Sequence, residues 1–308
     1  MSIMPSAIEG TCVFRDWRTW FRVTGSLGSK LTPLVVLHGG PGAAHNYTLR
    51  IANVDRSGRA VVHYDQLGVG QSTHLPNQPT DFWTVELFLE ELDNLLGHLG
   101  IADSYHLLGQ SWGGMLAAEH AVRRPRGLRS LVIANSPASM DLWVREADRL
   151  RGLPPESTQL VLRAHEQDGT TDHPDYLAAT KEFYNRFVCR VVPNPPEVVA
   201  SDEATAADPT VYHTMNGPNE FHVVGTLRDW TIVDRIPRID VPTLLINGAH
   251  DEATAITMQP FYDRIPNVEW TVFENSSHMP HVEEESRYLD VLNTFLIAHD
   301  GTEKTHAK

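Results

Sequence analysis

The stretch Gly109-Gln110-Ser111-Trp112-Gly113-Gly114 places a serine among small residues, and the rest of the chain is interpreted from it. The apolar run 105–108 precedes it and predicts a strand, whereas residues 115–121 predict a helix. A Gly-x-Ser-x-Gly sequence between strand and helix is typical of a nucleophile elbow. The glycines let strand and helix approach closely, so the serine hydroxyl projects above the sheet. An ordinary glycine-rich turn can have the same Gly-x-Ser-x-Gly sequence, so this interpretation needs support from other residues.

Short apolar runs alternate with helical segments on both sides of this motif. Residues 11–24 alternate in character and predict strands, as in a hairpin. Apolar residues recur at helical spacing over 82–99, and a closing helix is expected over 286–299. Strands that alternate with helices predict a mostly parallel, doubly wound α/β sheet. The remaining expected strands are 34–37, 60–64, 128–134, 241–246 and 268–273.

The alternation stops after Asn135-Ser136-Pro137 and returns at residue 241. Residues 138–230 contain helical segments, many charges and proline-rich punctuation, but no strong buried strand. The simplest interpretation is a core built from 1–137 and 231–308, with a helical cap inserted over 138–230. The tail from Asp300 is polar and is expected to fray.

Composition restricts the classes of function. The 308 residues include 25 Lys and Arg against 39 Asp and Glu, which gives a net charge of −14 and argues against a nucleic-acid partner. These carboxylates are interpreted as a solubilising surface, with attraction of a cationic substrate as the alternative. The apolar runs are too short to span a membrane. Residues 1–5 lack the pattern of a secretory signal, and two distant cysteines, Cys12 and Cys189, form no disulfide framework, so a reduced cytoplasmic location is expected.

A serine nucleophile needs a base, and the base needs an acid that orients it. On a sheet of this type the order along the chain is Ser, Asp or Glu, then His. Asp251 and His278 follow two expected strands, and parallel strands deliver such loops to one edge of the sheet. We therefore expect Ser111, Asp251 and His278 to form a catalytic triad.

The glycine-rich segment His38-Gly39-Gly40-Pro41-Gly42 follows the strand at 34–37. We expect the backbone amides of Gly40 and Trp112 to bind a developing oxyanion, with an ordinary tight turn as the alternative. No Gly-Lys-Ser/Thr follows, so a phosphate-binding loop is excluded. A His-Glu-x-x-His motif is absent, and the pair His278 and His281 lacks a third ligand, so no metal or other cofactor is expected.

Together these motifs resemble the proline iminopeptidase family of serine aminopeptidases, within the α/β-hydrolase fold. The resemblance covers nearly the whole chain and extends to tricorn-interacting aminopeptidases and L-amino-acid amidases. The first glycine motif, with its proline, and a cap motif carry most of its specificity. The matching segments are 38–42, 64–72, 109–114, 215–221 with Asp229-Trp230, 248–252 and Ser277-His278.

The resemblance implies that Glu220, in the cap, and Glu252, after the aspartate, grip the free α-amine of the substrate. Two carboxylates would offset the cost of placing a cationic amine in a water-poor site. They would also reject N-blocked substrates and leave room for one residue before the cut. The alternatives are a capping or solvated role for Glu220 and a surface role for Glu252. Candidates for the apolar pocket, each of which is otherwise ordinary core, are Trp112, Trp143, Tyr184, Phe187 and Tyr212.

The function expected from these residues is a serine hydrolase that releases an N-terminal amino acid, proline or another apolar residue, through an acyl-enzyme. Its substrate is a small peptide or an amino-acid amide, and its oligomeric state is left open. The nearest alternative is an amidase acting on free amino-acid amides. More distant alternatives are a general esterase or lactonase and a non-catalytic ligand-binding protein of this fold. Dehalogenases and epoxide hydrolases of the fold carry aspartate at the nucleophile, so Ser111 argues against them.

Overall fold

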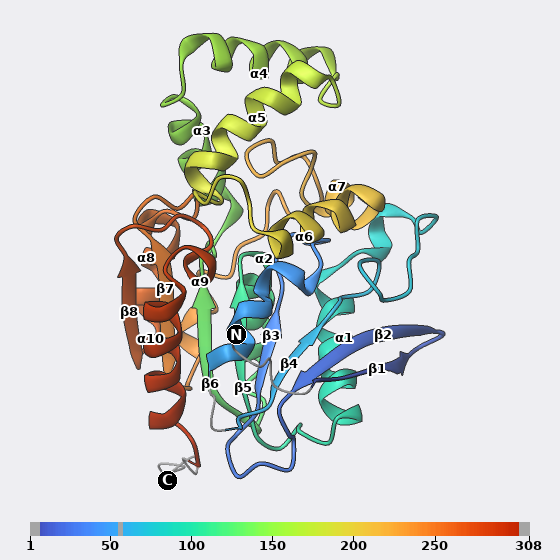
Figure 1. Cartoon of the computed structure of the whole chain (residues 1–308), viewed down its shortest axis with the longest axis vertical. Coiled ribbons are helices and arrows are strands. Elements are labelled where there is room, and N and C mark those ends of the chain that lie inside the picture. The colour runs from blue at the N-terminus through green and yellow to red at the C-terminus, as the bar shows by residue number, and fades with distance from the viewer. Residues whose placement is uncertain (1–6, 55–57, 302–308) are drawn as a thin grey trace.

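A computed structural model describes residues 7–54 and 58–301. Its central element is an eight-stranded sheet (Figure 1). The strand order is β1-β2-β4-β3-β5-β6-β7-β8, with β1 and β2 antiparallel and β3 to β8 parallel to one another. This confirms the predicted mostly parallel α/β sheet. The strands are β1 (Ala7–Phe14), β2 (Trp17–Thr24), β3 (Leu34–Leu37), β4 (Val61–Tyr64), β5 (Tyr105–Gln110), β6 (Leu128–Ala134), β7 (Thr243–Gly248) and β8 (Val268–Phe273).

Helices cover both faces of this sheet because its central strands are apolar on both sides. Val35 and Leu37 of β3 belong to one large apolar cluster, whereas Leu34 and Val36 belong to another. Residues of α1, α2 and α8 fill the first cluster, and residues of η1 and α10 fill the second. Period-two alternation therefore divides each strand between two cores. These elements are the 3₁₀ helix η1 (His45–Val54), α1 (Val85–His98), α2 (Trp112–Val122), α8 (Ala255–Arg264) and α10 (Glu285–Ala298).

Five helices between β6 and β7, here called the cap helices, lie at the end of the sheet to which the parallel strands point (Figure 1). An apolar cluster around Phe183 joins α3, α4 and α5, whereas α6 and α7 contribute to clusters that also contain core residues. Local signals set their ends: Ser139 accepts a hydrogen bond from the Leu142 amide, and Gly169 ends α4 in the left-handed conformation. The cap helices are α3 (Met140–Arg151), α4 (Glu156–Asp168), α5 (Pro174–Phe187), α6 (Pro196–Ala207) and α7 (Thr210–Met215).

Several details differ from the sequence-based expectations, and β7 lies two residues later than the strand expected at 241–246. The hairpin begins earlier than expected, at Ala7, and α8 was not foreseen, because Pro260 lies inside it. The tail prediction is wrong at its first residue, because Asp300 accepts hydrogen bonds at 2.9 and 2.6 Å from the buried guanidinium of Arg59. Residues 1–6 and the tail beyond Gly301 lie outside the described residues. Short additional helices are the 3₁₀ turns Thr80–Phe82 and Ile236–Arg238, and α9 (Pro280–Glu283).

Within residues 7–54 and 58–301, every helix is too short or too polar to span a bilayer. Cys12 and Cys189 are both buried free thiols, as the sequence predicts.

Candidate active site

Ser111 occupies the sharp turn between β5 and α2. Its φ of 56° and ψ of −125° are strained for a residue that carries a Cβ. Neighbouring glycines make the turn possible: a Cβ added to Gly109 would lie 1.9 Å from the carbonyl oxygen of Gly113. The Ser111 amide donates to the carbonyl oxygen of Ala134 at 2.9 Å, which ties the turn to β6. The predicted strand–serine–helix arrangement is therefore present, and Ser111 borders a cavity.

The glycine loop after β3 lies against this turn. A Cβ added to Gly39 would lie 2.9 Å from the Cβ of Ser111, so only glycine permits the approach. Gly40 has a φ of 110° and borders, with Ser111 and Trp112, a small space next to the main cavity. In the described part of the chain, no protein acceptor takes the amide hydrogen of Gly40 or of Trp112. The arrangement leaves two N–H donors beside the serine.

His278 and Asp251 meet at the same edge of the sheet. His278 Nδ1 lies 2.7 Å from Asp251 Oδ1, and both side chains are buried. Asp251 also accepts from the Asn135 side-chain amide at 2.5 Å and from the Ala253 backbone amide at 2.8 Å. Burial lowers the pKa of His278, but the Asp251 carboxylate outweighs burial and leaves that pKa above its ordinary value. This arrangement suits His278 as a base whose ring is oriented by the Asp251 carboxylate.

The third contact of the expected triad is not made. Within the described residues no hydrogen bond joins the Ser111 hydroxyl to His278, although both side chains border the same cavity. His278 Nε2 instead lies 3.8 Å from Glu252 Oε1. Hydrogen bonds between nucleophile and base are often long before substrate binds. The structure therefore gathers the three residues without closing the Ser–His bond.

Glu220 and Glu252 converge on this site from different parts of the chain. Glu252, in the loop after β7, is 2% exposed, and neither of its carboxylate oxygens has a hydrogen-bond partner. Glu220, after α7, accepts from the Tyr212 hydroxyl at 2.6 Å, and its amide donates to the Tyr184 hydroxyl at 3.3 Å. Burial raises the pKa of both carboxyls, and the charge of Glu220 raises that of Glu252 further.

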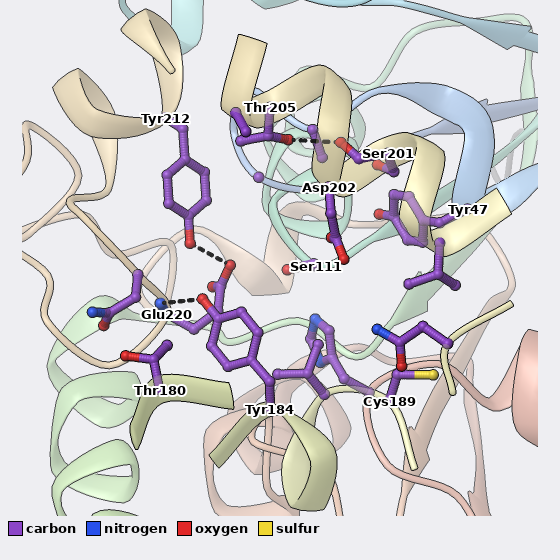
Figure 2. Close-up of a pocket in the computed structure, with 18 of the residues that line it drawn as sticks. Tyr47, Ser111, Thr180, Tyr184, Cys189, Ser201, Asp202, Thr205, Tyr212 and Glu220 are labelled. Atoms are coloured by element: carbon purple, nitrogen blue, oxygen red, sulfur yellow. Dashed lines mark hydrogen bonds between the residues drawn. The ribbon is translucent and has the colours of Figure 1, made fainter. Parts of the chain in front are cut away.

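A cavity of about 390 Å³ connects these groups. Figure 2 shows Tyr212 and Tyr184 converging on Glu220, with Asp202 pointing from α6 toward the same space. Of the pocket candidates, Tyr184 and Tyr212 line this cavity, whereas Trp112 and Trp143 line the adjoining small space. Phe187 was misplaced as a candidate, because it packs into the apolar cluster of the cap helices instead.

Both sequence and structure now identify relatives of this chain. A family model for the alpha/beta hydrolase fold matches residues 32–285. A proline iminopeptidase from Lactobacillus delbrueckii subsp. lactis is 37% identical over 93% of this chain and 97% of that protein. The chain belongs to the proline iminopeptidase family. A proline iminopeptidase from Clostridium botulinum is also 37% identical, over 95% of this chain and 99% of that protein.

Solved structures agree with membership of the proline iminopeptidase family. The crystal structure of a Mycobacterium smegmatis proline iminopeptidase is 54% identical, with a TM-score of 0.88 over 95% of this chain and 98% of that one. The crystal structure of a protein named VinJ is 55% identical, with a TM-score of 0.94 over 96% of this chain and 99% of that one. The family and the α/β-hydrolase fold predicted from the motifs are thereby confirmed.

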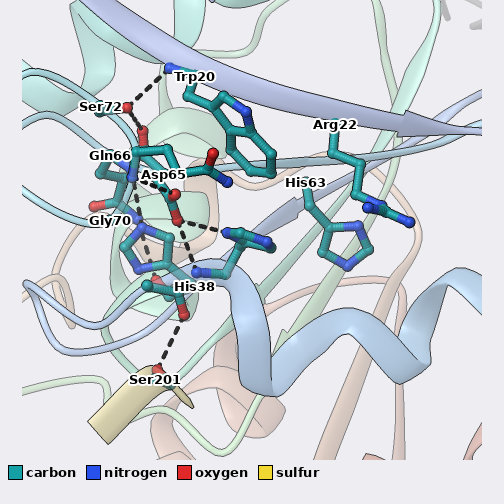
Figure 3. Close-up of polar contacts among 12 residues, drawn as sticks. Trp20, Arg22, His38, His63, Asp65, Gln66, Gly70, Ser72 and Ser201 are labelled. Atoms are coloured by element: carbon teal, nitrogen blue, oxygen red, sulfur yellow. Dashed lines mark hydrogen bonds and ion pairs between the residues drawn. The ribbon is translucent and has the colours of Figure 1, made fainter. Parts of the chain in front are cut away.

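Asp65 and Gln66, within the segment 64–72 that matched the family by sequence, support the glycine loop from behind (Figure 3). Asp65 accepts from the backbone and ring nitrogens of His45 at 2.9 and 2.8 Å and from the Gln71 amide at 2.9 Å. His38 accepts from the Gln66 amide at 3.0 Å. Buried polar groups satisfied in this way fix a loop in one conformation.

Several residues of the site escaped the sequence analysis. Asn135 served there only to mark a boundary, yet it binds Asp251. Tyr47, Gln110 and Asp202 border the cavity and were not singled out. For Asn135 the sequence does offer one indication, because it directly follows the end of the predicted strand that became β6.

His278 and His281, the histidine pair seen in the sequence, have different partners in the structure. His281 is buried and its Nε2 lies 3.0 Å from the carbonyl oxygen of Tyr47, so it does not form a ligand pair with His278. Among the described residues, the cluster with metal-ligand geometry is His165, His173 and Asp175, and none of these lines the cavity.

Proposed function

We propose that this hydrolase removes the N-terminal residue from short peptides through an acyl-enzyme on Ser111. Membership of a family of proline iminopeptidases supports an enzyme of the aminopeptidase type, and it sets aside the ligand-binding alternative without catalysis. Proline or another apolar residue is the first residue that we propose. The observation that carries the proposal is the buried carboxylate of Glu252. It lies 3.8 Å from Nε2 of His278, and neither of its oxygens has a hydrogen-bond partner among the described residues. A buried carboxylate in that state is suited to a cationic ligand.

In the proposed mechanism Glu220 and Glu252 bind the free α-amine and place the adjacent carbonyl over Ser111. His278 accepts the proton of the serine hydroxyl as the oxygen attacks, and Asp251 stabilises the imidazolium. The amides of Gly40 and Trp112 bind the oxyanion of the tetrahedral intermediate. His278 then protonates the leaving amine, and a water molecule, activated by the same base, releases the amino acid.

We also propose that residues 138–230 act as a cap on a core formed by 1–137 and 231–308. Five consecutive helices between β6 and β7, three of which share an apolar cluster of their own, support this division, and the last of the five leads to Glu220. The cavity of about 390 Å³ falls in the range that holds drug-sized ligands, which favours a peptide over an amide that releases only ammonia. A reduced cytoplasmic setting fits the two free cysteines.

A rate panel tests this function. Aminoacyl-nitroanilides and the matching amino-acid amides would be compared for proline and alanine, each with an N-acetylated control. The proposal expects rapid cleavage of unblocked substrates and none of the acetylated ones, and Ser111→Ala should be folded and inactive. Retained turnover by Ser111→Ala, or equal rates on acetylated substrates, would remove the basis of the proposal.

A further inference from the structure

Three loops that surround Ser111 are joined behind it by one chain of hydrogen bonds. Tyr47 of η1 lies at its centre, and its hydroxyl accepts from the Gly39 amide at 2.7 Å. The same hydroxyl donates to Gln110 Oε1. Gln110 Nε2 then donates to the carbonyl oxygen of His278 at 3.0 Å. The chain thus runs from the glycine loop through the serine turn to the histidine loop.

Each bond of this chain lies within one residue of a group that the mechanism uses. Gly39 precedes Gly40, Gln110 precedes Ser111, and the last bond reaches the backbone of His278 itself. A change in any bond therefore moves an oxyanion donor, the nucleophile or the base relative to the other two.

The position of the Tyr47 hydroxyl is fixed from several sides. Tyr47 and Gln110 are 4% and 1% exposed, and the carbonyl oxygen of Tyr47 bonds with His281 Nε2 at 3.0 Å. A Cβ on Gly39 would lie 2.8 Å from the Tyr47 hydroxyl and 3.1 Å from Gln110 Oε1. The glycine loop is therefore in close contact with both side chains. Burial also raises the pKa of Tyr47, which keeps the proton that the hydroxyl donates to Gln110.

We propose that Tyr47 and Gln110 are positioning residues that hold Gly40, Ser111 and His278 in the relative arrangement required for acyl transfer. This inference rests on the proposed function. Neither residue needs to contact the reacting carbonyl, because their effect passes through the backbone of the three loops. The rate of such a reaction is sensitive to displacements of about 1 Å, whereas binding of the substrate amine depends on Glu220 and Glu252.

The test compares Tyr47→Phe and Gln110→Met with a matched control, Tyr64→Phe. Tyr64 is also fully buried, but its hydroxyl has no hydrogen-bond partner. We expect kcat on a prolyl-nitroanilide to fall about 10- to 100-fold in both variants of the chain while KM stays near wild type. Tyr64→Phe should keep the wild-type kcat.

Two inhibitors with the same side chain separate positioning from binding. An aminoalkyl boronic acid forms a tetrahedral adduct with Ser111, so its affinity should fall in proportion to kcat/KM in both variants. The corresponding amino alcohol, which offers only the amine, should bind as it does to the wild type. The double variant should be slower than either single variant but by less than the product of the two separate factors, because both changes break the bond between Tyr47 and Gln110.

Thermal unfolding of each variant shows whether it is folded at the assay temperature. A folded Tyr47→Phe with wild-type kcat would overturn the inference, and so would a loss that appears in KM alone. If Tyr47→Phe does not fold, Gln110→Met decides, because it leaves the bond between Tyr47 and Gly39 in place. Activity in Ser111→Ala contradicts the proposed function instead, so the two failures are distinguishable.

Discussion

Replacing Glu252 by glutamine is the sharpest probe of how this site recognises its substrate. Glutamine keeps the size and shape of the side chain, but it removes a negative charge from a position that is 2% exposed. Glu220 remains and still accepts the hydrogen bond from Tyr212. The variant therefore leaves a substrate ammonium group with one carboxylate where the wild type offers two.

The magnitude follows from the geometry of a buried charge pair. At about 4 Å and an effective dielectric constant of about 20, one ion pair contributes about 4 kcal/mol. Burial raises the pKa of Glu252, which makes its charged form costly and brings the net gain below this figure. A net loss of about 2–3 kcal/mol corresponds to a roughly 30- to 150-fold fall in kcat/KM.

The assay measures kcat/KM on a prolyl-nitroanilide and on an activated acetate ester that has no amine. We expect the large loss on the first substrate and little change on the second. Glu203→Gln is the matched control, because Glu203 lies on α6 beside Asp202 but does not line the cavity. Equal losses on both substrates would refute the reasoning, since Glu252 would then act on His278, whose Nε2 lies 3.8 Å away.

Three other predictions follow from the same structure. Because Asp251 raises the pKa of His278, kcat should fall as the pH drops below that raised value; in Asp251→Asn the pH–rate profile should shift to lower pH and its plateau should fall roughly a thousandfold to ten-thousandfold. Partial loss of solvent at the cavity wall raises the pKa of Asp202 to about 6, so above that pH a dipeptide with a free carboxylate should be cleaved more slowly than the matching amide. In Asp202→Asn the rate on the amide divided by the rate on the free dipeptide should fall about three- to tenfold. An unchanged quotient would contradict this prediction. Gly109→Ala should lower the thermal unfolding midpoint sharply, whereas Gly97→Ala in α1, where a Cβ meets nothing, should raise it slightly.

The sequence predicted those parts of the molecule that follow local rules. The ends of β3, β6 and β8 agree with the prediction, and β3 is buried and apolar at every position, as expected for a strand covered on both faces. Ser111, Asp251 and His278 were found because each follows a strand of one parallel sheet. The topology thus determines where catalytic loops meet before any side-chain contact is known.

Other features depend on contacts that no local pattern encodes. Tyr47 and Gln110 lie 63 positions apart, and only the packing of η1 against the sheet brings the hydroxyl to the amide. Phe187 was expected at the pocket because aromatic residues look alike in sequence, yet the rotation of α5 directs it into the cap cluster. The helix around Pro260 forms although its sequence argues against it, because Met258 and Phe261 pack in the main core.

Asp251 and Glu252 are adjacent in the chain, and this adjacency has a consequence for how the family can diversify. One peptide bond joins the residue that orients the base to a residue proposed to hold the substrate amine. Under the proposed role of Glu252, the distance from amine to cleavage site is set within the core, whereas Glu220 and part of the cavity wall come from residues 138–230. Changes in the cap helices that line the cavity can therefore alter its shape without moving Asp251. Under the proposed roles, an enzyme that removes two residues at a time needs its amine site elsewhere, because Glu252 cannot move without moving Asp251 beside it.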